Sequence, residues 1–178
     1  MRIVGGKNRG KSILTPKNLA VRPTTDFAKE SLFNILNNTI NFEEVNLLEL
    51  FAGTGNIGYE FNSRGCQNIT SVDANFKCVQ FIKKMSKELN IQNRVIRADA
   101  FKFINKTKEQ FNFIFADPPY DHIDLIKLPN MIFSNDILTK DGILVIEHDK
   151  SVCFTEEKYF EKVKVYGKVN FSFFNFEA

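Results

Sequence analysis

The sequence predicts a doubly wound α/β fold, because short apolar strands alternate with helical patterns from residue 45 onward. Two of the expected strands, 113–116 and 143–146, are apolar without polar alternation, as in parallel strands that helices cover on both faces. The end of the chain differs. Residues 159–166 and 168–174 flank Gly167 with no helix between them, which predicts a closing antiparallel hairpin.

The other elements are predicted from turn residues and periodicity. Short apolar stretches at 2–4 and 12–14 flank a glycine-rich basic loop and predict a small N-terminal hairpin. Thr24 or Thr25 is the expected cap of a helix that ends at 37–38. Further strands are expected at 47–51, 69–72 and 94–97, and helices at 57–64, around 78–89 and at 101–106.

Length and composition fit one domain of 178 residues, with a basic hairpin and helix extension over 1–40 and a core over 45–178. No apolar run approaches the roughly 20 residues that span a bilayer, and the N-terminus lacks a signal-peptide pattern. The cysteines Cys66, Cys78 and Cys153 are odd in number and lack CxxC spacing, so buried free thiols are expected instead of disulfides or zinc. These features predict a cytoplasmic protein.

The net charge of +3 is unevenly distributed. Residues 1–25 contain no acid, and the rest of the chain is mildly acidic. Such a basic arm suggests an anionic partner, although a solvated, partly mobile terminus explains the charge equally well. The basic residues of the arm are Arg2, Lys7, Arg9, Lys11, Lys17 and Arg22.

A glycine-rich turn follows the first core strand. Gly53, Gly55 and Gly58 form GxGxxG, which on its own fits a dinucleotide or a purely structural turn. Acids at the ends of the next two strands, Asp73 and Asp99, can accept hydrogen bonds from the ribose hydroxyls and the adenine amino group of an adenosine. The candidate cofactor-binding residues are Glu49, Gly53, Thr54, Gly55, Asp73, Ala74, Asp99 and Ala100.

Glu49 separates two candidate cofactors. A carboxylate just before the glycines would lie close to the pyrophosphate of NAD, but it suits the ammonium and sulfonium of S-adenosylmethionine (SAM). The residues therefore favour SAM over NAD.

The most specific motif is Asp117-Pro118-Pro119-Tyr120, directly after a buried strand. The Asp117 carboxylate and the Pro118 carbonyl can each accept one N–H of an exocyclic amino group, and Tyr120 can stack on a base. Asp117 would stabilise the positive charge that develops on the nitrogen during methyl transfer. The four residues are the candidate catalytic set, and a rigid structural turn is the alternative.

Nearly the whole chain resembles the bacterial 16S rRNA (guanine-N2)-methyltransferases. The resemblance rests on the Asp-Pro-Pro-Tyr motif and on residues 1–6, 22–26, 49–55, 63–65, 147–148 and 166–168. It implies a Rossmann-like class I SAM methyltransferase fold, with a seven-stranded, mostly parallel sheet and a reversed last strand. It also implies SAM as methyl donor and a guanine of 16S rRNA as acceptor. The expected partner is 16S rRNA within the assembling small ribosomal subunit, and naked rRNA is the alternative.

Several alternatives stay open at this point. A DNA adenine-N6 or cytosine-N4 enzyme, a protein amide methyltransferase and a non-catalytic RNA-binding protein share parts of the pattern. Arg2, Lys7, Arg9, Lys11 and Arg22 are candidates for phosphate contacts, while the 22–26 stretch is as well explained as a brace for the first helix. His122 and His148 are interpreted as a surface and a structural residue. No metal site is expected, and nothing suggests more than a monomer.

Overall fold

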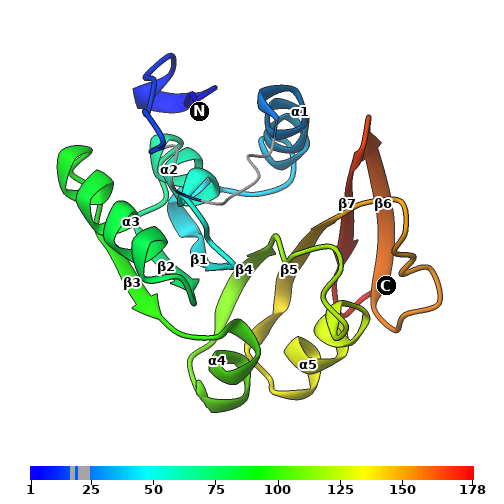
Figure 1. The fold of residues 1–178 in the computed structure, drawn as a ribbon. Helices are drawn as coiled ribbons and strands as arrows, with labels where there is room; N and C mark the ends of the chain where they lie inside the picture. The colour runs from blue at the N-terminus through cyan, green and yellow to red at the C-terminus, as the bar shows by residue number, and fades with distance from the viewer. Residues whose placement is uncertain (17–18, 20–24) are drawn as a thin grey trace.

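A computed structural model describes residues 1–16, 19 and 25–178. The described chain forms one sheet in the order β3-β2-β1-β4-β5-β7-β6 (Figure 1). The strands are β1 (Asn46–Leu50), β2 (Asn68–Asp73), β3 (Asn93–Arg97), β4 (Phe111–Ala116), β5 (Leu138–His148), β6 (Phe160–Tyr166) and β7 (Val169–Phe174). β1 to β5 pair in parallel, whereas β7 is antiparallel to both β5 and β6. The predicted Rossmann-like sheet with a reversed last strand is confirmed.

Helices cover both faces of the sheet. The α-helices are α1 (Asp26–Leu36), α2 (Asn56–Ser63), α3 (Phe76–Glu88), α4 (Ala100–Lys106) and α5 (Leu128–Ser134), and 3-10 turns lie at Gly6–Asn8, Phe42–Glu44 and Leu125–Lys127. Helices α1, α2 and α3 lie on one face and α4 and α5 on the other (Figure 1). Each face has its own cluster of buried apolar side chains, which explains why β4 and the second half of β5 lack polar alternation.

Most expected elements form close to their predicted bounds. The Thr25 hydroxyl accepts a hydrogen bond from the Ala28 amide and caps α1, while Thr24 lies outside the described residues. The N-terminal hairpin is only partly formed, with a single bridge between Arg2 and Ser12. The two stretches also share backbone hydrogen bonds from Ile3 to Lys11 and from Ile13 to Met1, and beyond Ile3 the amides of Val4 and Gly5 donate to Glu60 of α2 instead of to a second strand.

Three features differ from the sequence prediction. Helix α5 is absent from that prediction. Its first turn contains Pro129, and a helix of 7 residues is too short to show a clear apolar periodicity. β5 begins at Leu138 instead of residue 143, and a register shift against β4 separates its two parts. Cys153 is exposed, since it lies in the irregular segment after β5, so the expectation of buried thiols holds only for Cys66 and Cys78.

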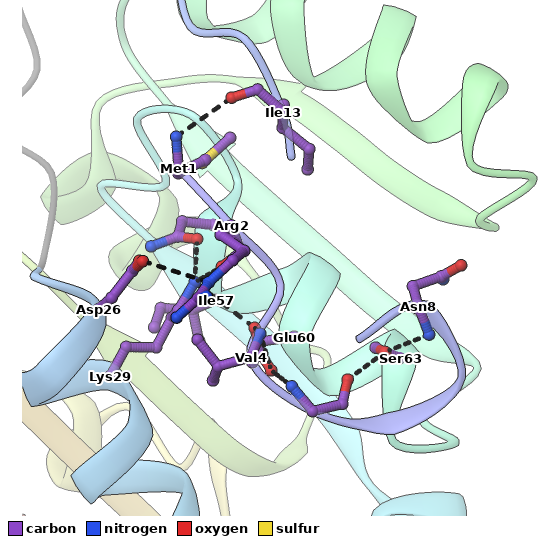
Figure 2. Close-up of polar contacts among 12 residues, drawn as sticks. Met1, Arg2, Val4, Asn8, Ile13, Asp26, Lys29, Ile57, Glu60 and Ser63 are labelled. Carbon is purple, nitrogen blue, oxygen red and sulfur yellow. Dashed lines mark hydrogen bonds and ion pairs between the residues drawn. The ribbon is translucent and has the colours of Figure 1, made fainter. Parts of the chain in front are cut away.

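A buried charged cluster joins the N-terminal segment to α1 and α2 (Figure 2). The side chains of Lys29 and Glu60 are both fully buried and lie 3.5 Å apart, and Arg64 pairs with the same carboxylate. The backbone amides of Val4 and Gly5 donate to Glu60 at 3.0 and 2.8 Å. Burial lowers the pKa of Lys29, and Glu60 opposes that shift. Glu60 is thus the common acceptor for three parts of the chain.

The first 16 residues are held against this cluster. Ser63 Oγ accepts from the Asn8 amide at 2.9 Å and donates to the Gly5 carbonyl (Figure 2). Ile3 and Ile13 are buried in the apolar cluster beneath α1 and α2. Residues 1–16 are therefore anchored to the core through Ile3, Ile13 and their backbone contacts with α2, while most of their side chains are exposed to solvent.

We expect Glu60→Gln to lower the free energy of unfolding by about 3–5 kcal/mol, because it leaves Lys29 and Arg64 without their buried counter-charge. Glu109→Gln is the matched control, since it breaks the exposed Arg94 pair and should cost no more than about 1 kcal/mol. Urea unfolding followed by circular dichroism measures both. Equal small losses would show that the buried cluster does not anchor the arm.

Candidate active site

A cavity of about 590 Å³ opens at the carboxyl edge of the parallel strands. This volume is in the range of small-molecule sites. Its lining comes from the segments that follow β1, β2 and β4. The described lining residues are Glu49–Thr54 together with Asn56, Ile57, Asp73, Ala74, Asn75, Cys78, Phe115, Asp117, Pro118, Pro119, Tyr120 and Asp121.

The sheet order brings these segments together. β1 lies between β2 and β4 in parallel register, with Leu50 opposite Val72 on one side and Ala116 on the other. The next residues of all three strands therefore emerge side by side. Residues near 50, 73 and 117 are distant in sequence but meet at one edge, where open α/β sheets bind ligands.

The turn after β1 depends on left-handed backbone conformations. Gly53 and Gly55 have φ values of 54° and 75°. Phe51 also has a positive φ of 56°, although it carries a side chain. A Cβ at Gly55 would lie 3.0 Å from the Tyr59 ring. Glycine at position 55 lets the turn continue directly into α2. The first amides of α2 then point towards the side chain of Glu49 in β1.

Glu49 is buried beneath this turn. Its carboxylate accepts the amides of Ile57 and Gly58, both at 3.2 Å, and the Ser71 hydroxyl at 2.8 Å. A Cβ at Gly58 would lie 2.9 Å from Glu49 Oε2, so the third glycine of the motif makes room for the acid. Burial raises the pKa of Glu49 to about 7 although these three donors oppose the shift. The effect of burial therefore outweighs that of the three donors, and the ionised form of Glu49 is only partly stabilised.

Asp73 connects two loops of the cavity. Its Oδ2 accepts the Gly53 amide at 2.7 Å and its Oδ1 accepts the Asn75 amide at 2.7 Å. Burial raises the pKa of this carboxyl, and the two amides counteract the rise. Each oxygen keeps a second lone pair for a ligand hydroxyl. The hydrogen bonds to the two loops are therefore compatible with the predicted ribose contact.

The Asp-Pro-Pro-Tyr turn forms the opposite wall. The Asp117 amide donates to the Leu50 carbonyl at 3.4 Å, which ties the turn to the end of β1. The Tyr120 hydroxyl donates to Glu147 Oε1 at 3.2 Å, and Glu147 is fully buried at the end of β5. Pro118 and Pro119 have no N–H groups, so the turn presents carbonyl and carboxylate acceptors.

The charge of the lining is one-sided. Four acids line the cavity, namely Glu49, Asp73, Asp117 and Asp121, and the described lining residues include no lysine or arginine. Such a wall repels a pyrophosphate and favours a ligand that carries positive charge.

All of the predicted cofactor-binding and catalytic residues line the cavity except Gly55, Asp99 and Ala100. Asp99 is exposed and caps α4 by accepting the Lys102 amide at 2.9 Å. Its contact with an adenine amino group stays a prediction.

The two histidines lie outside the cavity. The ring of His122 stacks on Phe101 with centroids 4.6 Å apart. His148 is buried and bonded to Ser172 at 2.8 Å, and burial lowers its pKa, in keeping with a structural residue.

The five predicted phosphate-binding residues of the basic arm differ in their surroundings. Lys7, Arg9 and Lys11 are exposed. Arg2 pairs with Asp26 at 3.6 Å, and Arg22 lies outside the described residues. Phosphate contacts of these five residues stay a prediction.

Sequence reasoning missed four polar or reactive lining residues, namely Asn56, Asn75, Cys78 and Asp121. Each directly neighbours a recognised motif or lies one turn along the following helix, which is the signal that could have identified them. Among the described residues, no three His, Cys, Asp or Glu side chains gather closely enough to hold a metal ion. None of the described helices has the length and apolar character of a membrane span.

Comparisons with known proteins agree with this architecture. The family model described as conserved hypothetical protein 95 matches residues 1–175. The putative rRNA methyltransferase YlbH of Bacillus subtilis is 37% identical over 157 residues, covering 85% of this chain and 84% of that protein. Ribosomal RNA small subunit methyltransferase D of Escherichia coli K12 is 31% identical over 150 residues, covering 84% and 75%.

A solved structure gives the same result in three dimensions. The putative methyltransferase yhhF from Escherichia coli superimposes with a TM-score of 0.84 at 27% identity, covering 98% of this chain and 96% of that one. The resemblance to an rRNA methyltransferase family is confirmed. The chain belongs to the family described as conserved hypothetical protein 95.

Proposed function

We propose that this protein is a SAM-dependent methyltransferase of the cytoplasm that methylates the N2 amino group of a guanine in 16S rRNA. One observation carries the proposal: a single cavity is lined by an acidic glycine-turn site and by the Asp-Pro-Pro-Tyr turn. The names of the curated relatives support rRNA as the substrate class.

The cavity fits SAM by its chemistry. SAM supplies an electrophilic methyl group on a sulfonium centre. Glu49 would favour its positive charge, and Asp73 would accept hydrogen bonds from its ribose hydroxyls. Gly53, Thr54 and Ala74 would line the part of the cavity that SAM occupies. Gly55, Asp99 and Ala100 complete the proposed set. Asp99, the N-cap of α4, would accept a hydrogen bond from the adenine amino group.

The acceptor end follows from the 117–120 turn. Asp117 and the Pro118 carbonyl would each accept one N–H of the guanine amino group and direct the nitrogen lone pair towards the methyl group. Positive charge develops on that nitrogen during transfer, and Asp117 would stabilise it more in the transition state than in the ground state. Tyr120, held by Glu147, would stack on the base.

The basic segment would bind the RNA backbone next to the core 45–178. Lys7, Arg9 and Lys11 are exposed on an arm whose position is fixed by Glu60 and Ser63. Arg2 and Arg22 belong to the same proposal. The expected partner is 16S rRNA in the assembling small subunit, bound by a monomer.

The direct test is transfer of tritium from SAM to small-subunit particles isolated from a strain lacking the gene, followed by mapping of the labelled nucleotide. We expect label in N2-methylguanosine of 16S rRNA. Label only in adenine, cytosine or protein would assign the enzyme to another substrate class.

We expect Asp117→Ala to reduce methyl transfer by about 100-fold or more, because it removes charge stabilisation made in the transition state. SAM affinity should stay close to that of the wild type, since SAM would contact the opposite wall. Calorimetric SAM titration and single-turnover assays measure the two effects. The control is Asp141→Ala, an exposed acid in β5. Wild-type rates in Asp117→Ala would rule out its assigned role.

The raised pKa of Glu49 makes cofactor binding depend on pH. An acid whose pKa is raised by folding stabilises the folded protein fully at pH values below its unfolded pKa. For Glu49 this contribution to the free energy of unfolding is lost as the pH rises through about 7. A bound cation favours the ionised form, so SAM affinity should increase as the pH rises through this range. In Glu49→Gln the affinity should be lower and independent of this ionisation. A wild-type affinity that is flat across this range would contradict a contact between Glu49 and the cation.

We expect combined replacement of Lys7, Arg9 and Lys11 by alanine to weaken RNA binding and its salt dependence. The slope of log K against log salt should become shallower by about 0.7–0.9 for each phosphate that the variant no longer neutralises. Replacement of Lys83, Lys84 and Lys87 on α3 removes the same charge from another surface and is the control. Equal effects of the two triple variants would show that the arm has no special role.

A further inference from the structure

Two aromatic side chains, one exposed and one half-buried, are in contact outside the cavity. Phe27, the second residue of α1, is 67% exposed. Its ring meets that of Tyr166, the last residue of β6, edge to face with centroids 6.1 Å apart. Tyr166 is only partly buried. An exposed single aromatic is common, but a pair in contact offers a continuous apolar surface in water.

The strand register places this pair at the edge of the sheet that carries the cavity. His148, at the carboxyl end of β5, pairs with Asn170 of β7, and Val169 pairs with Tyr166. The turn from β6 to β7 therefore lies at the same edge as the loops after β1, β2 and β4. Figure 1 shows α1 between the N-terminal segment and the β6–β7 hairpin.

On the hairpin the pair is surrounded by lysines, whereas on α1 the neighbours of Phe27 include Asp26, which pairs with Arg2, and the exposed Glu30. Lys164 shares the face of Tyr166, because their cross-strand partners Phe171 and Val169 both belong to the apolar cluster beneath α1. Lys164 and Lys168 are exposed. From residue 162 to 174 the chain contains lysines and no acid.

Exposed rings beside lysines match the chemistry of single-stranded nucleic acid. Bases stack on aromatic side chains irrespective of sequence, and lysines neutralise the phosphates that connect them. Unpaired nucleotides of folded RNA present such free base faces.

We propose that Phe27 and Tyr166, with Lys164 and Lys168, form a second RNA-binding surface that stacks an unpaired nucleotide outside the catalytic cavity. The inference rests on the proposed RNA substrate and adds a contact where α1 meets the β6–β7 hairpin. Together with the basic arm, this contact would orient the RNA across the edge that holds the 117–120 turn.

Fluorescence tests the surface without requiring catalysis. The chain contains no tryptophan, so Phe27→Trp introduces a single reporter at the pair. We expect a 16S rRNA transcript and single-stranded poly(A) to quench this fluorescence through stacking. Val165→Trp is the matched control, because Val165 is 63% exposed and directly precedes Tyr166 but points to the other face of the strand. Absence of quenching in Phe27→Trp, or equal quenching in both variants, overturns the proposal.

Steady-state kinetics separate this contact from the catalytic residues. Phe27→Ala and Tyr166→Ala should raise KM for small-subunit particles about tenfold with kcat retained, as expected when one stacking interaction is removed. Tyr166→Phe keeps the ring and should behave like the wild type. An unchanged KM in Phe27→Ala, which alters an exposed side chain, overturns the proposal even if Tyr166→Ala fails to fold.

The outcomes distinguish this inference from the proposed function. Methyl transfer by the wild type with an unaffected KM in the variants rejects the second surface alone. No transfer to rRNA together with stacking of poly(A) on Phe27→Trp rejects the proposed reaction but keeps an RNA-binding surface. A raised KM on particles without any effect on protein-free RNA would assign the pair to a ribosomal protein and overturn the inference.

Discussion

The parallel order of β2, β1, β4 and β5 is the constraint on which the candidate active site depends. It delivers Glu49, Asp73 and Asp117 to one edge and concentrates negative charge around a single cavity. Burial of Glu49 is incompletely compensated by its three donors, as its raised pKa shows. A cationic ligand would supply the missing compensation and stabilise the ionised form of Glu49.

The buried Lys29–Glu60 pair connects this cavity to the basic arm. Lys29 donates to the Arg2 carbonyl and, at 2.9 Å, to Asn56 Oδ1, and Asn56 lines the cavity. The arm, α1 and the start of α2 therefore share one network of hydrogen bonds (Figure 2). Cations on the arm are held at a fixed place relative to the cavity, which a flexible basic tail would not achieve.

Elements with local sequence signals can be predicted from the sequence. Elements whose formation depends on packing against distant parts of the chain are missed. The glycine turn and the Asp-Pro-Pro-Tyr turn are fixed by backbone chemistry, so both can be predicted. Helix α5 has one apolar face over only 7 residues, and its burial depends on α4 and β5. A buried lysine such as Lys29 cannot be foreseen from a helical pattern, because its counter-charge lies 31 positions away at Glu60.

A crystal structure with SAM bound tests the central claim most directly. The account requires the sulfonium side of SAM near Glu49 and its methyl group directed at the space in front of Asp117 and Pro118. A bound SAM whose methyl group points away from that turn, with the turn too distant for loop movement to close the gap, would contradict it.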